Sequence, residues 1–211
     1  MARETIVFFV ALVVSIILHE ISHGIVALWF GDDTAKRAGR LTLNPIPHID
    51  PFGSIVLPAM GAIVGMPVFG YAKPVPVNPN RLHKPRRDML YVSLAGPALN
   101  LTLMVVAAIG ARLLYENGPL VGTYPELPLV TRIVFTFAVV NMLLGVFNLL
   151  PIPPLDGSAL LERVLPREWL PSWYKFRPYG ILLLLVLIFW TGAAAKVLDP
   201  LIDQLFNWVF R

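Results

Sequence analysis

The stretch from Ile6 to Phe30 is apolar over a length that can span a lipid bilayer, which takes about 20 residues. Its only ionisable side chains are His19, Glu20 and His23, in the sequence HEISH. Ionisable groups at membrane depth are costly, and they usually serve a function. The stretch therefore predicts a membrane-spanning helix with a functional polar face.

The spacing of these three side chains is typical of a zinc protease. On a helix, His19 and His23 lie four positions apart on one face, so both can bind the same metal ion. Glu20 lies beside them, where it can contact a metal-bound water and act as a general base. The alternative interpretation is a buried, hydrogen-bonded polar cluster that holds helices together.

The composition places the whole chain in a membrane. Hydrophobic residues make up 56% of the 211 residues, 14% are charged, and the mean hydropathy is +0.70. Soluble domains carry about 25% charged residues. We therefore expect an all-α polytopic membrane protein. The net charge of +4 comes from basic residues gathered in particular loops, so we expect no nucleic-acid partner. The chain has no cysteine, so zinc would have to be bound by His, Asp or Glu.

Long apolar runs predict four full transmembrane helices. A fifth run, residues 52–70, is interrupted by glycines and prolines that weaken a helix, so it predicts a re-entrant or hairpin segment. Residues 199–211 place apolar side chains on one helical face, which predicts an amphipathic interfacial tail. We expect residues 1–211 to form a single membrane-embedded domain. The four full spans are predicted at 6–30, 89–115, 130–150 and 179–198.

The distribution of Lys and Arg predicts the orientation in the membrane. Basic residues gather in loops 31–50, 71–88 and 151–178, which places these loops in the cytoplasm. Loop 116–129 contains no Lys or Arg, so it is expected outside. Segment 52–70 then enters and leaves on the same side, and both chain termini are external.

A catalytic zinc site normally takes three protein ligands, so the two histidines need a third. The thermolysin arrangement would place a glutamate about 20 residues after the second histidine, but this region has Leu43. The best remaining acid is Asp156, which follows the third full span in a turn rich in proline and ends with Gly157. By the predicted topology, Asp156 and His23 lie near the same, cytoplasmic, side.

Three other residues carry side chains that could bind a metal ion. Asp50 is the strongest rival to Asp156, because it lies in an apolar stretch on the same side of the membrane. His48 and His83 stand in proline-rich loops, where a solvated or hydrogen-bonded histidine is the simpler interpretation. We leave these two histidines out of the predicted metal site.

The sequence resembles the site-2 protease family of intramembrane zinc metalloproteases, the M50 peptidases. Three motifs carry the resemblance: HEISH at 19–23, AGPALN at 95–100 and NLLPIPPLDG at 148–157. Together they cover a catalytic core from residue 1 to about 160, which the helix and tail at 179–211 follow. The compact form, without a PDZ or CBS domain, resembles a minimal subgroup of the family.

The resemblance implies a role for each motif residue. His19, His23 and Asp156 would bind one zinc ion, and Glu20 would activate water. Asn148 would hold the scissile carbonyl or its oxyanion. Asn100 could also have a role in the site. The alternative for both Asn100 and Asn148 is the structural role of pairing helices through hydrogen bonds. Residues 40–50 would form a short membrane-embedded β-hairpin that presents the substrate as an extended strand.

The expected function is that of a zinc-dependent intramembrane endopeptidase, which cleaves transmembrane segments of membrane-protein substrates. The expected location is a prokaryotic cell membrane, with the active site near the cytoplasmic side. Two alternatives remain: a zinc-binding chaperone or receptor that does not cleave, and a metal transporter. The intact Glu20 argues against the first. The almost wholly apolar remaining spans argue against the second.

Overall fold

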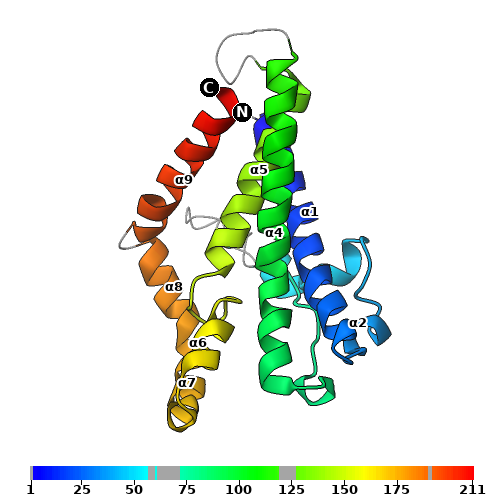
Figure 1. Ribbon diagram of the computed structural model, residues 1–211, viewed down its shortest axis with the longest axis vertical. Coiled ribbons are helices and arrows are strands. Elements are labelled where there is room, and N and C mark those ends of the chain that lie inside the picture. Colours follow the sequence, from blue (N-terminus) through cyan, green and yellow to red (C-terminus); the bar gives the residue numbers. More distant parts are fainter. Residues whose placement is uncertain (1, 57–59, 61–71, 119–126, 190–191) are drawn as a thin grey trace. The chain divides into compact units, whose positions relative to one another are not determined.

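The computed structural model describes residues 2–56, 60, 72–118, 127–189 and 192–211. All regular structure within these ranges is helical, as the prediction of an all-α protein requires (Figure 1). The elements, in chain order, are α1 (Ala2–Trp29), α2 (Thr34–Arg37), η1 (Ile46–His48), η2 (Pro51–Val56), η3 (Pro79–Arg81), α4 (Pro85–Glu116), α5 (Leu129–Asn148), α6 (Ser158–Val164), η5 (Arg167–Trp169), α7 (Leu170–Phe176), η6 (Arg177–Tyr179), α8 (Gly180–Phe189) and α9 (Ala193–Phe210).

The chain divides into two compact units, which are described separately. The histidine unit comprises residues 16–96 and contains the second half of α1 and the start of α4. The aspartate unit comprises residues 1–15 and 97–211, and it contains α5 and all later helices.

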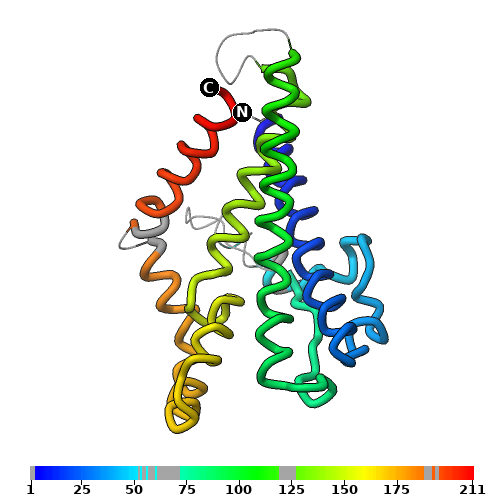
Figure 2. The backbone as a smooth tube through the Cα atoms, in the orientation of Figure 1, coloured from blue at the N-terminus to red at the C-terminus, as the bar shows by residue number. Residues whose placement is uncertain are grey.

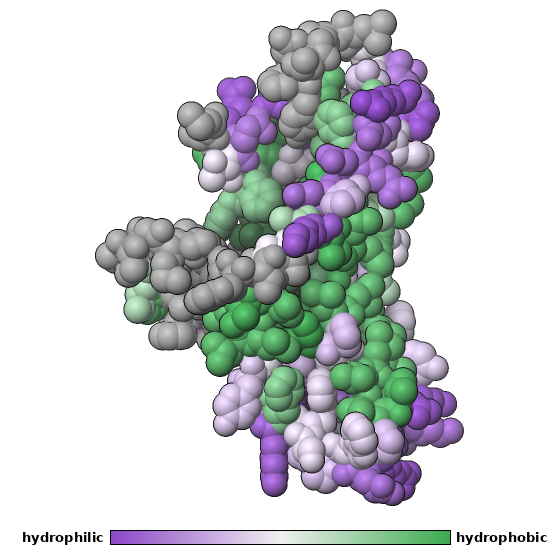
Figure 3. Space-filling model, turned by 90° about the vertical axis from the view of Figure 1, so that its left-hand side faces the viewer, coloured by the Kyte–Doolittle hydropathy of each residue, from purple (hydrophilic) through white to green (hydrophobic). Residues whose placement is uncertain are grey.

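Among the described residues, three helices are long and apolar enough to cross a membrane: α1 from Arg3 onward, α4 and α5. They match the spans predicted at 6–30, 89–115 and 130–150, with ends that differ by a few residues. Their outer faces expose large apolar side chains; Ile6, for example, is 63% exposed. Figure 3 shows a band of apolar side chains across the middle of one face, with hydrophilic side chains at both ends, and several large apolar side chains of α8 are exposed. A surface of this kind suits contact with lipid rather than water.

The fourth predicted span, 179–198, is not confirmed as one continuous helix. The structure has α8 up to Phe189 and a separate helix, α9, that begins at Ala193. Between them Gly192 has a φ of +61°, in the left-handed region that glycine adopts without strain. Residues 190 and 191 lie outside the described part of the chain. The predicted amphipathic tail is helical, as part of α9.

The β-hairpin expected at about 40–50 is not confirmed. These residues form bends and the short helix η1, in which His48 donates its N–H to the carbonyl of Pro45 at 2.9 Å. Proline lacks an N–H and fixes φ, so Pro45 and Pro47 interrupt the ladder that a hairpin requires. The re-entrant segment predicted at 52–70 lies largely outside the described residues. At its start, residues 51–56 form the π-helical turn η2.

The core of the aspartate unit is a close packing of α4, α5 and α9. Small residues on α4 and α5 leave room for aromatic rings, and the rings of Phe135 and Phe210 lie 4.8 Å apart. Beside this core, the buried Asn100 donates its side-chain amide to Asn141 at 2.8 Å, and Asn141 donates to the hydroxyl of Ser15 at 2.8 Å. These two bonds link α4, α5 and α1 at a depth where lipid offers no partner.

The histidine unit has a smaller apolar cluster, in which Ala27, Leu82 and Val92 are buried. An extended segment, residues 72–78, leads without helical turns into η3 (Figure 2). This segment contacts the second half of α1 through Glu20 and the loop after α1 through Asp32.

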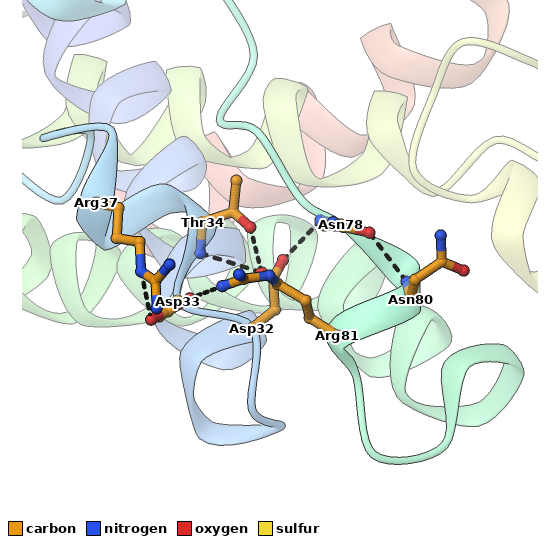
Figure 4. Close-up of polar contacts among 7 residues, drawn as sticks. All are labelled: Asp32, Asp33, Thr34, Arg37, Asn78, Asn80 and Arg81. Atoms are coloured by element: carbon orange, nitrogen blue, oxygen red, sulfur yellow. Dashed lines mark hydrogen bonds and ion pairs between the residues drawn. The ribbon is translucent and has the colours of Figure 1, made fainter.

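Asp32 joins the end of α1 to this extended segment (Figure 4). Its carboxylate is fully buried and accepts hydrogen bonds from the N–H of Thr34 at 3.0 Å, the hydroxyl of Thr34 at 2.5 Å and the N–H of Asn78 at 2.6 Å. Burial opposes ionisation, but these bonds and the charge of Arg81 outweigh it and hold the pKa of Asp32 below its ordinary value of 3.8. The neighbouring Asp33 pairs instead with Arg37 and Arg81.

We predict that Asp32→Asn destabilises the protein by about 1 to 3 kcal/mol at pH 7, since the substitution removes a buried hydrogen-bonded charge. Because the pKa of Asp32 is lower in the folded state than in the unfolded state, its ionised carboxylate stabilises the fold at pH values above the unfolded-state pKa. This stabilisation is lost as the pH falls through the folded-state pKa. The difference between wild type and variant should therefore shrink when the pH falls well below 3.8. Thermal unfolding in detergent from pH 7 to pH 3 measures it.

The matched control is Asp33→Asn. Asp33 pairs with basic side chains at the surface, and such pairs contribute below about 1 kcal/mol. A difference between wild type and Asp32→Asn that stayed the same at pH 3 and pH 7 would show that ionised Asp32 does not stabilise the fold.

Candidate active site

The two motif histidines lie together on one face of α1. Their Nε2 atoms are 3.1 Å apart, and their ring planes meet at 85°. Both are buried, with exposed fractions of 6% for His19 and 8% for His23. Two nitrogens at about 2.0–2.1 Å from a tetrahedral zinc ion lie about 3.3 Å apart. The observed spacing therefore fits two ligands of one ion.

The backbone of α4 sets the tautomer of His23. Its Nδ1 lies 2.6 Å from the carbonyl oxygen of Val92. A carbonyl oxygen only accepts hydrogen bonds, so Nδ1 carries the proton and Nε2 keeps the lone pair that a metal ion needs. On the same helix Ser22 donates its hydroxyl to the carbonyl of His19 at 2.6 Å, which satisfies that hydroxyl within the span.

Gly96 on α4 keeps the space beside both imidazoles open. A Cβ at this position would lie 2.5 Å from Nε2 of His19 and 2.6 Å from Nε2 of His23. Contacts below 3.0 Å are essentially never seen for a real Cβ. Glycine is therefore required here if the metal-binding nitrogens are to keep their positions.

Glu20 is partly buried and held by the extended segment of the histidine unit. Its Oε2 accepts a hydrogen bond from the backbone N–H of Val75 at 2.7 Å. The carboxylate is adjacent in sequence to His19, and its orientation is determined by a backbone donor that lies 55 residues away along the chain. A carboxylate beside a metal-binding pair is the arrangement that a general base requires.

Asp156 and Asn148 lie in one turn, at the end of α5 in the aspartate unit. Gly157 donates its N–H to the carbonyl of Asn148 at 2.6 Å, which closes the turn. A Cβ on Gly157 would lie 2.2 Å from the carbonyl oxygen of Leu149, so the turn needs glycine. Asp156 is half-buried, and Asn148 donates its side-chain amide to the carbonyl of Leu144 at 3.0 Å.

The rival metal ligands have other partners within the histidine unit. Asp50 accepts a hydrogen bond from the N–H of Gly53 at 2.7 Å at the start of η2. His48 is 3% exposed, and its Nε2 lies 3.0 Å from the carbonyl oxygen of Thr42, within its own loop. His83 is exposed.

Sequence reasoning missed the backbone groups that support the site. The carbonyl of Val92 and the N–H of Val75 belong to apolar residues whose side chains carry no chemical signal. Gly96 belongs to the AGPALN motif, but its place beside the two imidazoles does not follow from that motif. A signal for it was present, because a Gly-Pro pair inside a long span weakens the helix and so requires a reason.

Known proteins support the assignment that this geometry suggests. The model of peptidase family M50 matches residues 7–127 and 119–189. YwhC of Bacillus subtilis, named as a candidate zinc metalloprotease, is 37% identical over 96% of this chain and 91% of its own length. Rip2 of Mycobacterium tuberculosis, with a name of the same kind, is 36% identical over 82% of this chain and 63% of its own length.

A zinc metalloprotease of Methanocaldococcus jannaschii, MJ0392, is 24% identical over 77% of this chain and 35% of its own length. No solved structure matches the chain. The family match extends across most of the chain, and it includes the histidine pair on α1, Glu20 between them and the turn that carries Asp156. The chain is therefore a member of peptidase family M50, the site-2 protease family, and a zinc metallopeptidase.

Proposed function

We propose that this metallopeptidase cleaves transmembrane segments of membrane-protein substrates within the bilayer. The observation that carries the proposal is the position of His19, Glu20 and His23 inside α1, a helix long and apolar enough to span a membrane. A peptidase with its histidines and base at this depth acts on chains that reach the same depth, and these are transmembrane segments. The proposed partners are therefore membrane-protein substrates and the surrounding lipid.

His19, His23 and Asp156 are the proposed ligands of one zinc ion. Two neutral imidazoles and one carboxylate are a common donor set of catalytic zinc sites, and they leave one coordination position open. The spacing of the imidazole nitrogens and the space beside Gly96 support the fit. When bound, zinc polarises a peptide carbonyl and makes water more acidic.

The protein's own groups carry out the remaining steps. Glu20 takes a proton from the attacking water, and later gives a proton to the leaving amine. Asn148 turns its amide toward the scissile carbonyl and stabilises the negative charge that develops on the oxygen. The substrate helix has to unwind before this attack, because a helical carbonyl is already hydrogen-bonded and is shielded by its own turns.

The proposed orientation places the site near the cytoplasmic side, with both termini outside. α1 ends at Trp29 and is followed by Lys36 and Arg37 in α2. Basic residues next to the end of a span favour the cytoplasm. His23 lies less than two turns from the end of α1, so the proposed metal site lies on that side. Relatives in bacteria and an archaeon support a prokaryotic cell membrane as the location.

The first test of the function is Glu20→Gln. Loss of the general base should lower the cleavage of a model transmembrane substrate in detergent by about 100-fold or more, while the bound zinc stays at the wild-type level. Glu116→Gln is the matched control, because Glu116 is exposed at the end of α4 and pairs with Arg112. Full activity in Glu20→Gln would overturn the proposed mechanism. Zinc flux into liposomes that survived this substitution would favour a transporter.

The second test concerns the third ligand. Loss of a group that only hydrogen-bonds to a metal ligand lowers metal affinity by roughly 10- to 100-fold. Asp156→Asn should lower the affinity for zinc by more than this, because it removes a proposed ligand itself. The measurement is zinc content after equilibration with a chelator series, followed by elemental analysis. Asp203→Asn, on the exposed side of α9, is the control. Equal zinc affinity in Asp156→Asn and wild type would contradict Asp156 as the third ligand and favour Asp50 in that role.

The third test uses two glycines of α4. Gly96→Ala should abolish tight zinc binding and cleavage, because its Cβ would overlap both imidazoles. Gly110→Ala adds the same group on the same helix, where it would meet Val134 at an ordinary 3.6 Å. This control should retain activity and gain up to about 1 kcal/mol of stability from helix propensity. Wild-type zinc binding in Gly96→Ala would contradict the arrangement of the histidine pair.

A further inference from the structure

The extended segment 72–78 offers a single backbone donor to the proposed base. Val75 lies between Pro74 and Pro76, neither of which has an N–H. The N–H of Val75 is therefore the only amide hydrogen from residue 74 to residue 76, and it donates to Oε2 of Glu20 at 2.7 Å. The two prolines also restrict the backbone to an extended form, so the direction of this N–H varies little.

The segment is anchored on both sides of this donor. On one side, Lys73 donates its N–H to the carbonyl of His48 at 2.9 Å and accepts a bond from the guanidinium of Arg40 at 2.6 Å. On the other side, Asn78 donates its N–H to the buried carboxylate of Asp32 at 2.6 Å.

The side chain of Val75 adds a third anchor, because it is only 8% exposed. Its Cγ1 lies 3.1 Å from the place that a Cβ of Gly24 would take, one turn beyond Glu20 on α1. The donor is thus packed against the helix that carries the base. A segment anchored at three points fixes the position of the Val75 amide hydrogen far better than a flexible loop would.

We propose that the N–H of Val75 is a positioning group for Glu20. This inference rests on the proposed function, in which Glu20 is the general base. The terminal torsion of a glutamate is broad and turns easily. A charge-assisted bond to Oε2 holds the carboxylate in one orientation and directs Oε1 toward the water that it deprotonates. The donor acts through Glu20 and does not touch the substrate.

The same N–H would have a different effect if it bound the substrate. An extended segment with a free donor can pair with a peptide, and removal of that donor would weaken substrate binding. Removal of a group that orients the base slows the chemical step and leaves binding unchanged. The ratio of the effects on kcat and KM therefore distinguishes the two roles.

The first experiment replaces Val75 with proline, which removes the donor in a backbone that is already restricted by Pro74 and Pro76. Val77→Pro is the matched control, since Val77 also follows a proline, and the described residues offer its N–H no acceptor. Val77 is partly buried and packs against the apolar cluster of the histidine unit, so the control also loses side-chain contacts. We expect kcat to fall about 10- to 100-fold in Val75→Pro with an unchanged KM, and to stay within about twofold of wild type in Val77→Pro.

The second experiment measures the bond without catalysis. Hydrogen exchange, followed by mass spectrometry, measures the exchange rate of the Val75 amide hydrogen. Residues 74 and 76 do not interfere, because both are prolines and have no amide hydrogen. Glu20→Ala removes the acceptor and should speed exchange at Val75 at least tenfold relative to wild type. Glu20→Gln keeps an oxygen and should retain most of the protection. Both variants can be compared in the zinc-loaded protein.

The possible outcomes separate this inference from the proposed function. If the wild type cleaves and Val75→Pro cleaves as well as Val77→Pro, the positioning role is wrong while the function stands. An increased KM with an unchanged kcat would also overturn it, in favour of a substrate contact. Equal exchange at Val75 in Glu20→Ala and wild type would show that the bond does not form in solution. A wild type that cleaves no membrane substrate would instead overturn the proposed function.

Discussion

A polar group inside an apolar span has to find its partner within the protein, because lipid offers none. This requirement determines the surroundings of α1. His23 needs an acceptor for its Nδ1 proton and finds the carbonyl of Val92 on α4. Glu20 needs a donor for its carboxylate and finds the N–H of Val75 on the extended segment. The two elements that flank the polar face of α1 in the histidine unit are therefore the two that satisfy it.

Close approach of these elements depends on residues without bulk. At Gly24 a Cβ would lie 2.5 Å from a methyl group of Leu41, and at Gly96 it would overlap both imidazoles. Small residues let backbones approach closely inside a membrane, where dispersion and hydrogen bonds replace the hydrophobic effect as the source of association. In this chain the same closeness has a chemical use, since a backbone carbonyl and a backbone N–H can reach side chains on α1 directly. The proposed catalytic face thus combines two histidines, the proposed base and two main-chain partners.

The sequence predicted the parts of this arrangement that depend on composition and spacing. The long spans follow from uninterrupted apolar runs, and the pairing of His19 and His23 follows from helical periodicity. The break at Gly192 depends on backbone geometry, which composition does not reveal, whereas Pro45 and Pro47 already argued against a hairpin in the described residues 40–50. The link between Glu20 and Val75 joins residues 55 positions apart through a main-chain atom. No pattern of side chains encodes such a contact.

Backbone partners give the site a kind of robustness that side-chain partners do not. A carbonyl at Val92 or an N–H at Val75 survives almost any substitution at its own position, with proline as the exception for the donor. These backbone groups keep their positions only if their segments stay in place. The position of the extended segment depends on residues such as Asp32, which is fully buried and lies at the junction of α1 with this segment. Asp32 lies beyond the membrane-spanning part of α1, which ends at Trp29, yet it anchors the segment whose N–H bonds Glu20 within the span. The position of the proposed base, Glu20, therefore depends on an acidic residue that has no proposed part in the chemistry.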